Sequence, residues 1–182
     1  VRVSVLIKTS KEAASNFQEQ LGYRLRTKDV PYKFIKYPSA DQIKSASGPL
    51  WIGPLMDKEI AGRLTEECAI QTCLPTSDEL EELIAKGLAW SDKDVEYATR
   101  EMIRSVKHIS SAADLLSRKH MLLSLNSMPR LAGTKGAPKM DDVISDLIEL
   151  GYSAARYPDM EPMFVTDASF DDVISIFRKY HY

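Results

Sequence analysis

Two Gly-Pro pairs, at residues 48–49 and 53–54, bracket a short apolar stretch that contains Trp51. Proline breaks a helix interior because it lacks a backbone N–H, and the residue before it avoids helical dihedrals. A long helix therefore cannot cross residues 47–56. We predict a rigid turn in this segment, with Trp51 buried as a packing anchor.

The residues before this turn have the pattern of a small mixed layer. Apolar side chains alternate over residues 1–7, as in a half-buried strand. Ser10 is a suitable N-cap, and the apolar stripe behind it predicts a helix that stops at Gly22. Residues 23–27 and 32–37 read as two further strands. The order is β-α-β-β, so we expect an α+β fold.

The residues after the turn indicate short capped helices. Asp57 can cap the first of them, and Thr76 with Glu79 has the spacing of a capping box. The helix that follows Thr76 stops at Gly87.

The stretch 66–76 reads as a connector, and we place the domain boundary there. The expected domains are an α+β subdomain over residues 1–70, which contains the Gly-Pro-Leu-Trp segment, and a second subdomain over residues 71–182.

The second half predicts helices followed by a hairpin. A helix over residues 141–150 has Val143, Ile144, Leu147 and Ile148 inward, and the loop before it occupies most of residues 126–139. The other elements are helices over 95–106 and 112–119, strands over 152–157 and 163–166, and a last helix capped by Ser169. This order is typical of a winged-helix-like module with a β-hairpin wing, in which the third helix often faces a nucleic-acid groove.

The net charge of −2 conceals four blocks of alternating sign. Residues 1–55 carry nine Lys/Arg and four Asp/Glu, and residues 100–139 carry eight and two. The two blocks between and after them, 56–99 and 140–182, are acidic. The basic blocks can present local positive surface to phosphates, and they can equally be solvated faces that pair with the acidic blocks.

Composition and termini limit the cellular setting. The longest apolar runs are far shorter than the roughly 20 residues of a membrane-spanning helix, so we expect no membrane association. Two cysteines, Cys68 and Cys73, fit a reducing compartment, and we expect a cytoplasmic protein. The start Val1-Arg2-Val3 lacks an initiator Met and is read as a strand, so we expect a piece of a longer protein.

No motif for catalysis or for a cofactor is found. The eight glycines form neither a dinucleotide fingerprint nor a P-loop, and no glycine-rich strand-to-helix turn suits S-adenosylmethionine. The two cysteines are five apart without a second Cys or His pair, so no metal is expected.

A cluster of cations is the strongest binding signal. Five of them fall within 22 residues that contain no acid: Arg118, Lys119, Arg130, Lys135 and Lys139. Lys and Arg that neutralise phosphates release counterions and give affinity without sequence specificity. The tetrapeptide Gly133-Thr134-Lys135-Gly136 has the form of the loop with which KH domains clamp nucleic-acid backbone, but its neighbouring prolines favour a flexible turn.

Two stretches resemble the tRNA guanine-26 N2-dimethyltransferase family. One is Gly48-Pro49-Leu50-Trp51-Ile52-Gly53-Pro54-Leu55 with Asp57, and the other runs from Met140 to Arg156 and continues in Val165-Thr166-Asp167-Ala168. The chain departs from its relatives at three places. It lacks their Cys cluster before the Gly-Pro-Leu-Trp segment, it has Tyr157-Pro158 where they usually have Thr-His, and it has Val165 in place of Lys.

This resemblance implies the tRNA-binding C-terminal domain of an S-adenosylmethionine-dependent guanine N2-(di)methyltransferase. The cofactor and the catalytic residues would belong to an N-terminal domain of the parent protein, so this chain is expected to have no catalytic site and to bind no S-adenosylmethionine. The expected partners are tRNA and that N-terminal domain. Arg156 is the one matched cation, and it joins the expected RNA-binding set of Arg118, Lys119, Arg130, Lys135, Lys139 and Arg156.

A winged-helix interaction module that binds DNA or protein, without an enzymatic role, is the alternative. It leaves residues 1–66 and the Gly-Pro-Leu-Trp segment without an explanation.

Overall fold

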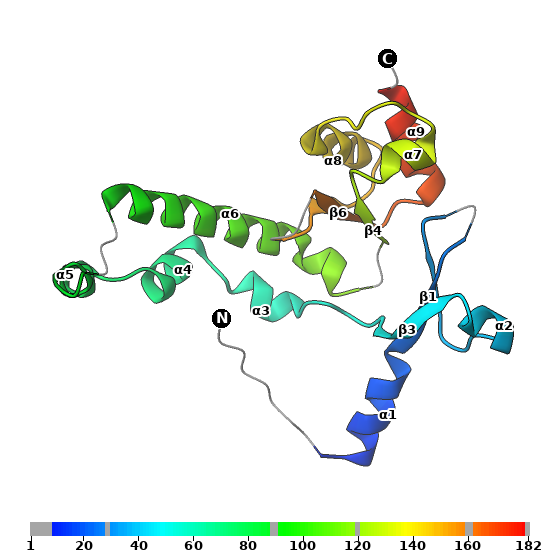
Figure 1. Ribbon diagram of the computed structural model, residues 1–182, viewed down its shortest axis with the longest axis horizontal. Coiled ribbons are helices and arrows are strands. Elements are labelled where there is room, and N and C mark those ends of the chain that lie inside the picture. The colour runs from blue at the N-terminus through cyan, green and yellow to red at the C-terminus, as the bar shows by residue number, and fades with distance from the viewer. Residues whose placement is uncertain (1–8, 28–29, 88–90, 119–120, 159–161, 181–182) are drawn as a thin grey trace. The chain divides into compact units, whose positions relative to one another are not determined.

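The computed structural model describes residues 9–27, 30–87, 91–118, 121–158 and 162–180 of the chain. The strand expected over residues 1–7 lies outside them. The chain forms two compact units, Val1–Gly53 and Pro54–Tyr182, and each contains a three-stranded antiparallel sheet. The fold is therefore α+β (Figure 1).

Unit 1 is a helix followed by a small sheet of order β2-β1-β3. Ser10 caps the first helix as expected, because its Oγ accepts the N–H of Ala13 at 2.9 Å. The elements are α1 (Lys11–Glu19), β1 (Leu21–Leu25), β2 (Lys33–Ile35), α2 (Ala40–Ile43) and β3 (Ala46–Trp51).

Two glycines of unit 1 permit close packing between strands. Gly22 does not end α1 but lies within β1, where a Cβ would come 2.7 Å from Cδ1 of Ile52. A Cβ on Gly48 would come 2.7 Å from Cδ1 of Tyr23, and its φ of +157° also disfavours a side chain. The Gly-Pro-Leu-Trp segment is therefore strand β3 and not the predicted turn. Pro49 is tolerated because β3 is an edge strand.

The prediction of a buried Trp51 is also wrong. The residue is 42% exposed, and its ring lies 5.7 Å from the ring of Phe17 on α1. Trp51 closes the end of β3 opposite Leu21, at the edge of a unit too small to cover it.

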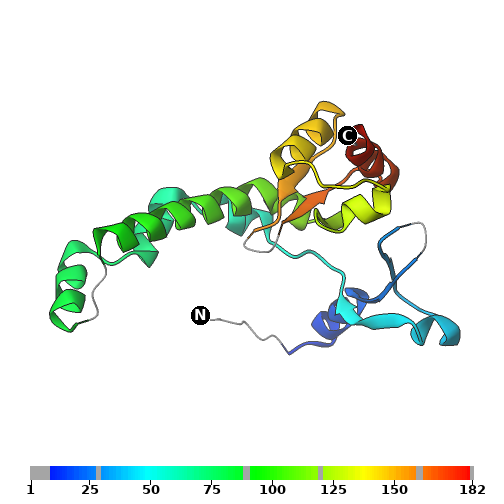
Figure 2. The ribbon, with the colours of Figure 1, turned by 45° about the horizontal axis from the view of Figure 1, so that its top comes forward.

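Unit 2 begins with four helices: α3 (Lys58–Gly62), α4 (Glu66–Cys73), α5 (Ser77–Ala85) and α6 (Asp92–Leu116). The caps expected at Asp57 and Thr76 are present. Thr65 and Ser91 cap α4 and α6 in the same way. Figures 1 and 2 show α3 and α4 running alongside the long helix α6, on which both pack.

Two expectations for this region need correction. The predicted connector at residues 66–76 is mostly α4, which is short and buries only Ala69 among its residues, so its apolar period is weak. The helices expected over 95–106 and 112–119 are one helix, because no Gly or Pro interrupts α6.

The division between the units also differs from the expected boundary near residue 70. It falls between Gly53 and Pro54, since α3 and α4 pack on α6 and the N–H of Leu55 donates to the carbonyl of Leu116 at 2.7 Å.

The remainder of unit 2 is a sheet of order β4-β6-β5 with helices around it. The expected hairpin of β5 and β6 is present, and β4 extends it on the other side of β6. A short helix, α7, occupies part of the predicted 126–139 loop, with Pro129 in its first turn where proline is tolerated. The elements are β4 (Met121–Ser124), α7 (Met128–Ala132), α8 (Met140–Glu149), β5 (Ala154–Arg156), β6 (Met163–Thr166) and α9 (Phe170–Lys179).

Both faces of β6 are buried. Phe164 packs with residues of α7, α8 and α9, while its neighbour Val165 packs with Ala112, Leu115 and Leu116 of α6. Successive strand residues point to opposite faces, so this sheet is a middle layer between α6 and the three later helices. None of the helices in the described ranges is long and apolar enough to cross a membrane.

Neighbouring residues of α8 test this packing. Leu147 is fully buried, whereas Ile148, expected inward, is 55% exposed. Leu147→Ala should lower the free energy of unfolding of unit 2 by about 2–5 kcal/mol through lost burial and a cavity. Ile148→Ala is the matched control and should change it by less than about 0.5 kcal/mol. Urea unfolding followed by circular dichroism measures both, and equal losses would contradict the core described here.

Candidate nucleic-acid interface

The structure separates five of the six predicted cations into two groups. Arg130, Lys135 and Lys139 are exposed and lie on one continuous segment, from α7 to the N-cap of α8. Arg118 and Arg156 are held in ion pairs. Lys119 lies outside the described residues.

The segment that carries the exposed cations, residues 128–139, is anchored at both ends by buried methionines. Met128 is fully buried at the start of α7, and Met140 is buried at the start of α8. Between them, Gly133 ends α7 in the left-handed conformation with φ of 74°, and the N–H of Thr134 donates to the carbonyl of Pro129 at 2.9 Å. We call residues 128–139 the basic segment.

Arg178 of α9 also supports this segment. Its Nε donates to the carbonyl oxygen of Ala132 at 3.3 Å, across 46 residues of sequence. A cation at the C-terminal end of a helix interacts favourably with the carbonyl groups there. Arg178 is not among the predicted residues: its position in the last turn of a helix is visible in the sequence, but its distant partner is not.

The described carboxylates leave the charge of the basic segment uncompensated. Within the part of the chain that the structure describes, Arg130, Lys135 and Lys139 make no ion pair, and residues 128–139 contain no Asp or Glu. Exposed cations of this kind interact with phosphate groups of a polynucleotide through charge and not through base recognition.

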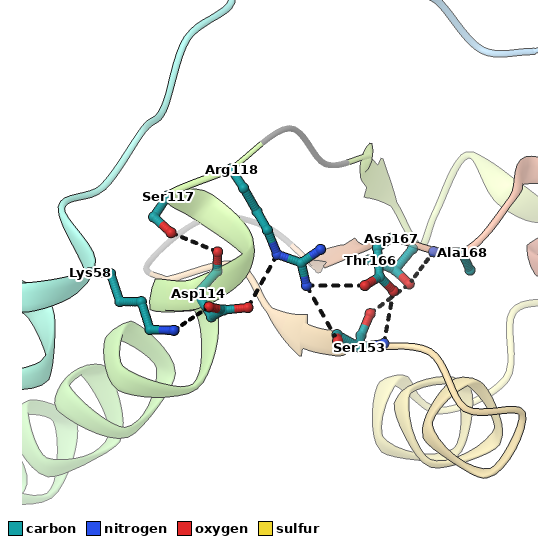
Figure 3. Close-up of polar contacts among 8 residues, drawn as sticks. All are labelled: Lys58, Asp114, Ser117, Arg118, Ser153, Thr166, Asp167 and Ala168. Carbon is teal, nitrogen blue, oxygen red and sulfur yellow. Dashed lines mark hydrogen bonds and ion pairs between the residues drawn. The ribbon is translucent and has the colours of Figure 1, made fainter.

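Arg118 has a different setting, at the centre of a polar network between α6 and the sheet (Figure 3). Its Nε lies 3.1 Å from Oδ2 of Asp114, and one terminal nitrogen lies 3.1 Å from Oδ2 of Asp167. Lys58 of α3 also pairs with Asp114 at 2.5 Å. Asp114 thus pairs with both Lys58 and Arg118, and Asp167 pairs with Arg118 alone. The charge of Arg118 is balanced within the protein.

Thr166 and Asp167, which belong to the motif in the C-terminal stretch, lie at the end of the sheet opposite the turn between β5 and β6. Thr166 Oγ1 donates to the carbonyl of Ser153 at 2.8 Å and accepts the N–H of Ala168 at 3.1 Å. Asp167 Oδ1 accepts the N–H of Ser153 at 2.8 Å. Burial alone would raise the pKa of Asp167, but the hydrogen bonds from Ser153 and Arg118 lower it below its ordinary value.

Arg156 connects β5 to the first turn of α8. Its Nε and a terminal nitrogen both donate to Oδ1 of Asp141, at 3.1 and 2.7 Å. This cation is therefore also paired within the protein, and its contact stabilises the approach of α8 to the sheet.

No metal-ligand cluster accompanies these cations in the described ranges. Among the described residues, no three His, Cys, Asp or Glu side chains lie together as metal ligands, and Cys68 and Cys73 are exposed free thiols. A mostly apolar groove between α3, α4 and α6 is lined by Met56, Ile60, Leu64 and Ile109, together with Asp57, Arg63 and Cys68.

A structural likeness to a known protein covers nearly the whole chain. Trm1 from Pyrococcus horikoshii, solved in complex with S-adenosyl-L-methionine, matches 93% of this chain with a TM-score of 0.59 and 20% sequence identity. The chain spans 38% of the length of that protein. Neither a scan against protein-family models nor a search of curated proteins gave a match. The likeness shows that this chain shares the fold of one part of that protein.

Asp167 provides a test of the polar network. Asp167→Ala leaves the N–H of Ser153 without its acceptor and should lower the free energy of unfolding by about 1–3 kcal/mol. Glu149→Ala, which removes an exposed carboxylate of α8, should change it by less than about 0.5 kcal/mol.

The pH dependence of the same variants follows from the lowered pKa of Asp167. A carboxyl group with a lowered folded-state pKa contributes stability above its unfolded pKa of about 3.9 and loses it as the pH falls through the folded pKa. Asp167→Ala should therefore lose less stability than the native chain as the pH falls below about 4. Parallel pH profiles in thermal unfolding would contradict this role.

Proposed function

We propose that this chain is the tRNA-binding C-terminal part of an S-adenosylmethionine-dependent tRNA guanine N2-(di)methyltransferase, and that it holds tRNA through the basic segment. The fold likeness carries this proposal. It covers 93% of this chain, and the matching protein was solved in complex with S-adenosyl-L-methionine. The resemblance of residues 48–57 and 140–168 to the methyltransferase family supports it.

The order of elements in unit 2 supports a winged-helix-like module. Helix α6, strand β4, helices α7 and α8, and strands β5 and β6 follow one another, and β6 is the central strand of the sheet. In such modules the third helix often enters a groove. Here that helix is α8, whose exposed side chains include Asp142 and Glu149, so its surface disfavours phosphates. The adjoining basic segment is the more favourable contact.

The described residues do not fit S-adenosylmethionine. Nucleotide-like cofactors in open α/β folds bind at the carboxyl ends of parallel strands, near a glycine-rich turn into a helix. Both sheets of this chain are antiparallel, and no such turn is present within the described ranges. The methyl transfer to the exocyclic amine of guanine therefore belongs to the N-terminal domain of the parent protein, and this chain orients the tRNA. A cytoplasmic location of the parent protein is part of this proposal.

Arg118 and Arg156 are given a structural role in this proposal. A phosphate would have to displace an aspartate from each of them, at 3.1 and 2.7 Å respectively. Arg130, Lys135 and Lys139 need no such exchange.

Charge reversal in the basic segment tests the proposal. The variant Lys135→Glu with Lys139→Glu should weaken tRNA binding. The slope of log affinity against log salt should become less steep by the amount that about two phosphate contacts contribute. The control is Arg63→Glu with Lys93→Glu, an equal change of charge at two exposed residues of α3's C-cap and α6. Fluorescence anisotropy with labelled tRNA at several salt concentrations measures affinity, and thermal unfolding verifies the fold.

A duplex DNA of similar length separates the proposal from its alternative. A tRNA-binding domain should bind tRNA more tightly than DNA at every salt concentration. Equal binding to both, or equal weakening by the basic-segment variant and its control, would contradict the proposal and favour an interaction module for DNA or protein.

A further inference from the structure

One face of the unit 1 sheet presents aromatic rings and arginines together. In the β1–β2 ladder Arg24 lies directly opposite Phe34, and in the β1–β3 ladder it lies opposite Ser47. Directly opposed residues share a face of a sheet, with Cβ atoms roughly 4.5–5.5 Å apart. Arg24 is exposed, and Phe34 is 39% exposed although it is a large apolar residue in a strand.

A second ring extends this face. The ring of Tyr32 lies 5.2 Å from that of Phe34 at an angle of 59°, so one ring supports the other in a tilted pair. Leu50, opposite Gly22 on the same face, is also 39% exposed. The other face differs, because Trp51 lies opposite Leu21 and contacts Phe17 of α1.

The charge of this face is positive, and no carboxylate in the described part of unit 1 pairs with it. Arg24 and Arg26 stand at alternate positions, and both are exposed. In the described part of unit 1, Glu19 and Asp41 are paired with Lys36 and Lys44, and neither arginine has an ion-pair partner.

We infer that this face, composed of Arg24, Arg26, Tyr32 and Phe34, binds unpaired nucleotides of an RNA. Exposed aromatic rings on a sheet provide stacking platforms for unstacked bases, and neighbouring cations follow the phosphate backbone. A protein partner or a second copy of this chain could bind through the apolar rings alone. The two arginines, which pair with no carboxylate among the described residues, favour a polyanion.

This face would extend the RNA contact of the proposed function from unit 2 to unit 1. It uses different residues and a different feature of RNA, since the basic segment meets phosphates of folded tRNA and this face meets unpaired bases. An experiment can therefore contradict RNA binding at one of these surfaces and leave RNA binding at the other intact.

Substitutions of Phe34 in the 182-residue chain test the inference, with a fluorescein-labelled 12-nucleotide oligouridine as the probe. Phe34→Leu keeps apolar volume but removes the ring, and it should weaken binding about tenfold, as loss of one stacked base does. Phe34→Tyr keeps the ring and should bind within about twofold of the native chain. Phe17→Leu, at an exposed ring of α1, is the matched control and should leave affinity unchanged.

Arg24→Gln tests the charge of the same face independently of ring packing. It should reduce the slope of log affinity against log salt by about 0.7, the value for one phosphate contact of a single strand. Thermal unfolding verifies that each variant folds, and Arg24 is exposed, so this arm remains informative if Phe34→Leu does not fold.

Several results would overturn the inference. They are no binding of oligouridine by the native chain, equal affinity of Phe34→Leu and the native chain, equal weakening by Phe34→Leu and Phe17→Leu, or an unchanged salt slope in Arg24→Gln. A concentration-dependent dimer in sedimentation that Phe34→Leu abolishes would also overturn it, because a second copy would then cover the face. Lys135→Glu with Lys139→Glu should leave oligouridine binding largely intact, which separates this result from failure of the proposed function.

Discussion

The burial of both faces of strand β6 determines how unit 2 is built. Phe164 requires apolar partners from α7, α8 and α9, while Val165, the next residue, requires partners from α6. A strand with one solvated face would need only one covering layer. Because β6 needs two covering layers, the first residues of α7 and α8, Met128 and Met140, are buried against the core. The residues between these two anchors face outward, and they carry the cations that pair with no described carboxylate.

The same organisation distinguishes two uses of arginine and lysine. Arg118 and Arg156 lie where helices meet the sheet, and aspartates from another element neutralise each of them. Arg130, Lys135 and Lys139 lie between the buried anchors, where no carboxylate reaches them in the described structure. Exposed ion pairs contribute little stability, so the paired arginines chiefly orient α6 and α8. The unpaired cations contribute potential that a polyanion can use.

Local signals in the sequence predicted local structure well. Ser10, Asp57, Thr76 and Ser169 each cap the helix expected of them, because a cap needs only a side-chain oxygen and a backbone N–H two or three residues on. Gly87 follows a helix end in the left-handed region, as expected, and Gly151 does the same after α8. The order of α8, β5, β6 and α9 was also predictable, since each has a clear period and a clear stop.

Features that depend on distant residues were not predictable. The Gly-Pro pairs at residues 47–56 exclude a helix and suggested a turn, yet the part up to Trp51 is edge strand β3, which tolerates proline. Helix α4 has too few buried residues for a readable period, and it exists because it packs on α6. The sequence also placed Arg118 among the binding cations, because its partner Asp167 lies 49 residues away. Pairing across the fold decides which cations remain available.

Hydrogen–deuterium exchange of the whole chain, with and without saturating tRNA, tests the central claim that the cations between the two buried anchors meet the RNA. Amide exchange reports where backbone becomes protected. The account predicts slowed exchange over residues 128–139, with little change over the acidic helices α4 and α5. Protection concentrated on α4 and α5, or no protection of residues 128–139 at saturation, would contradict it.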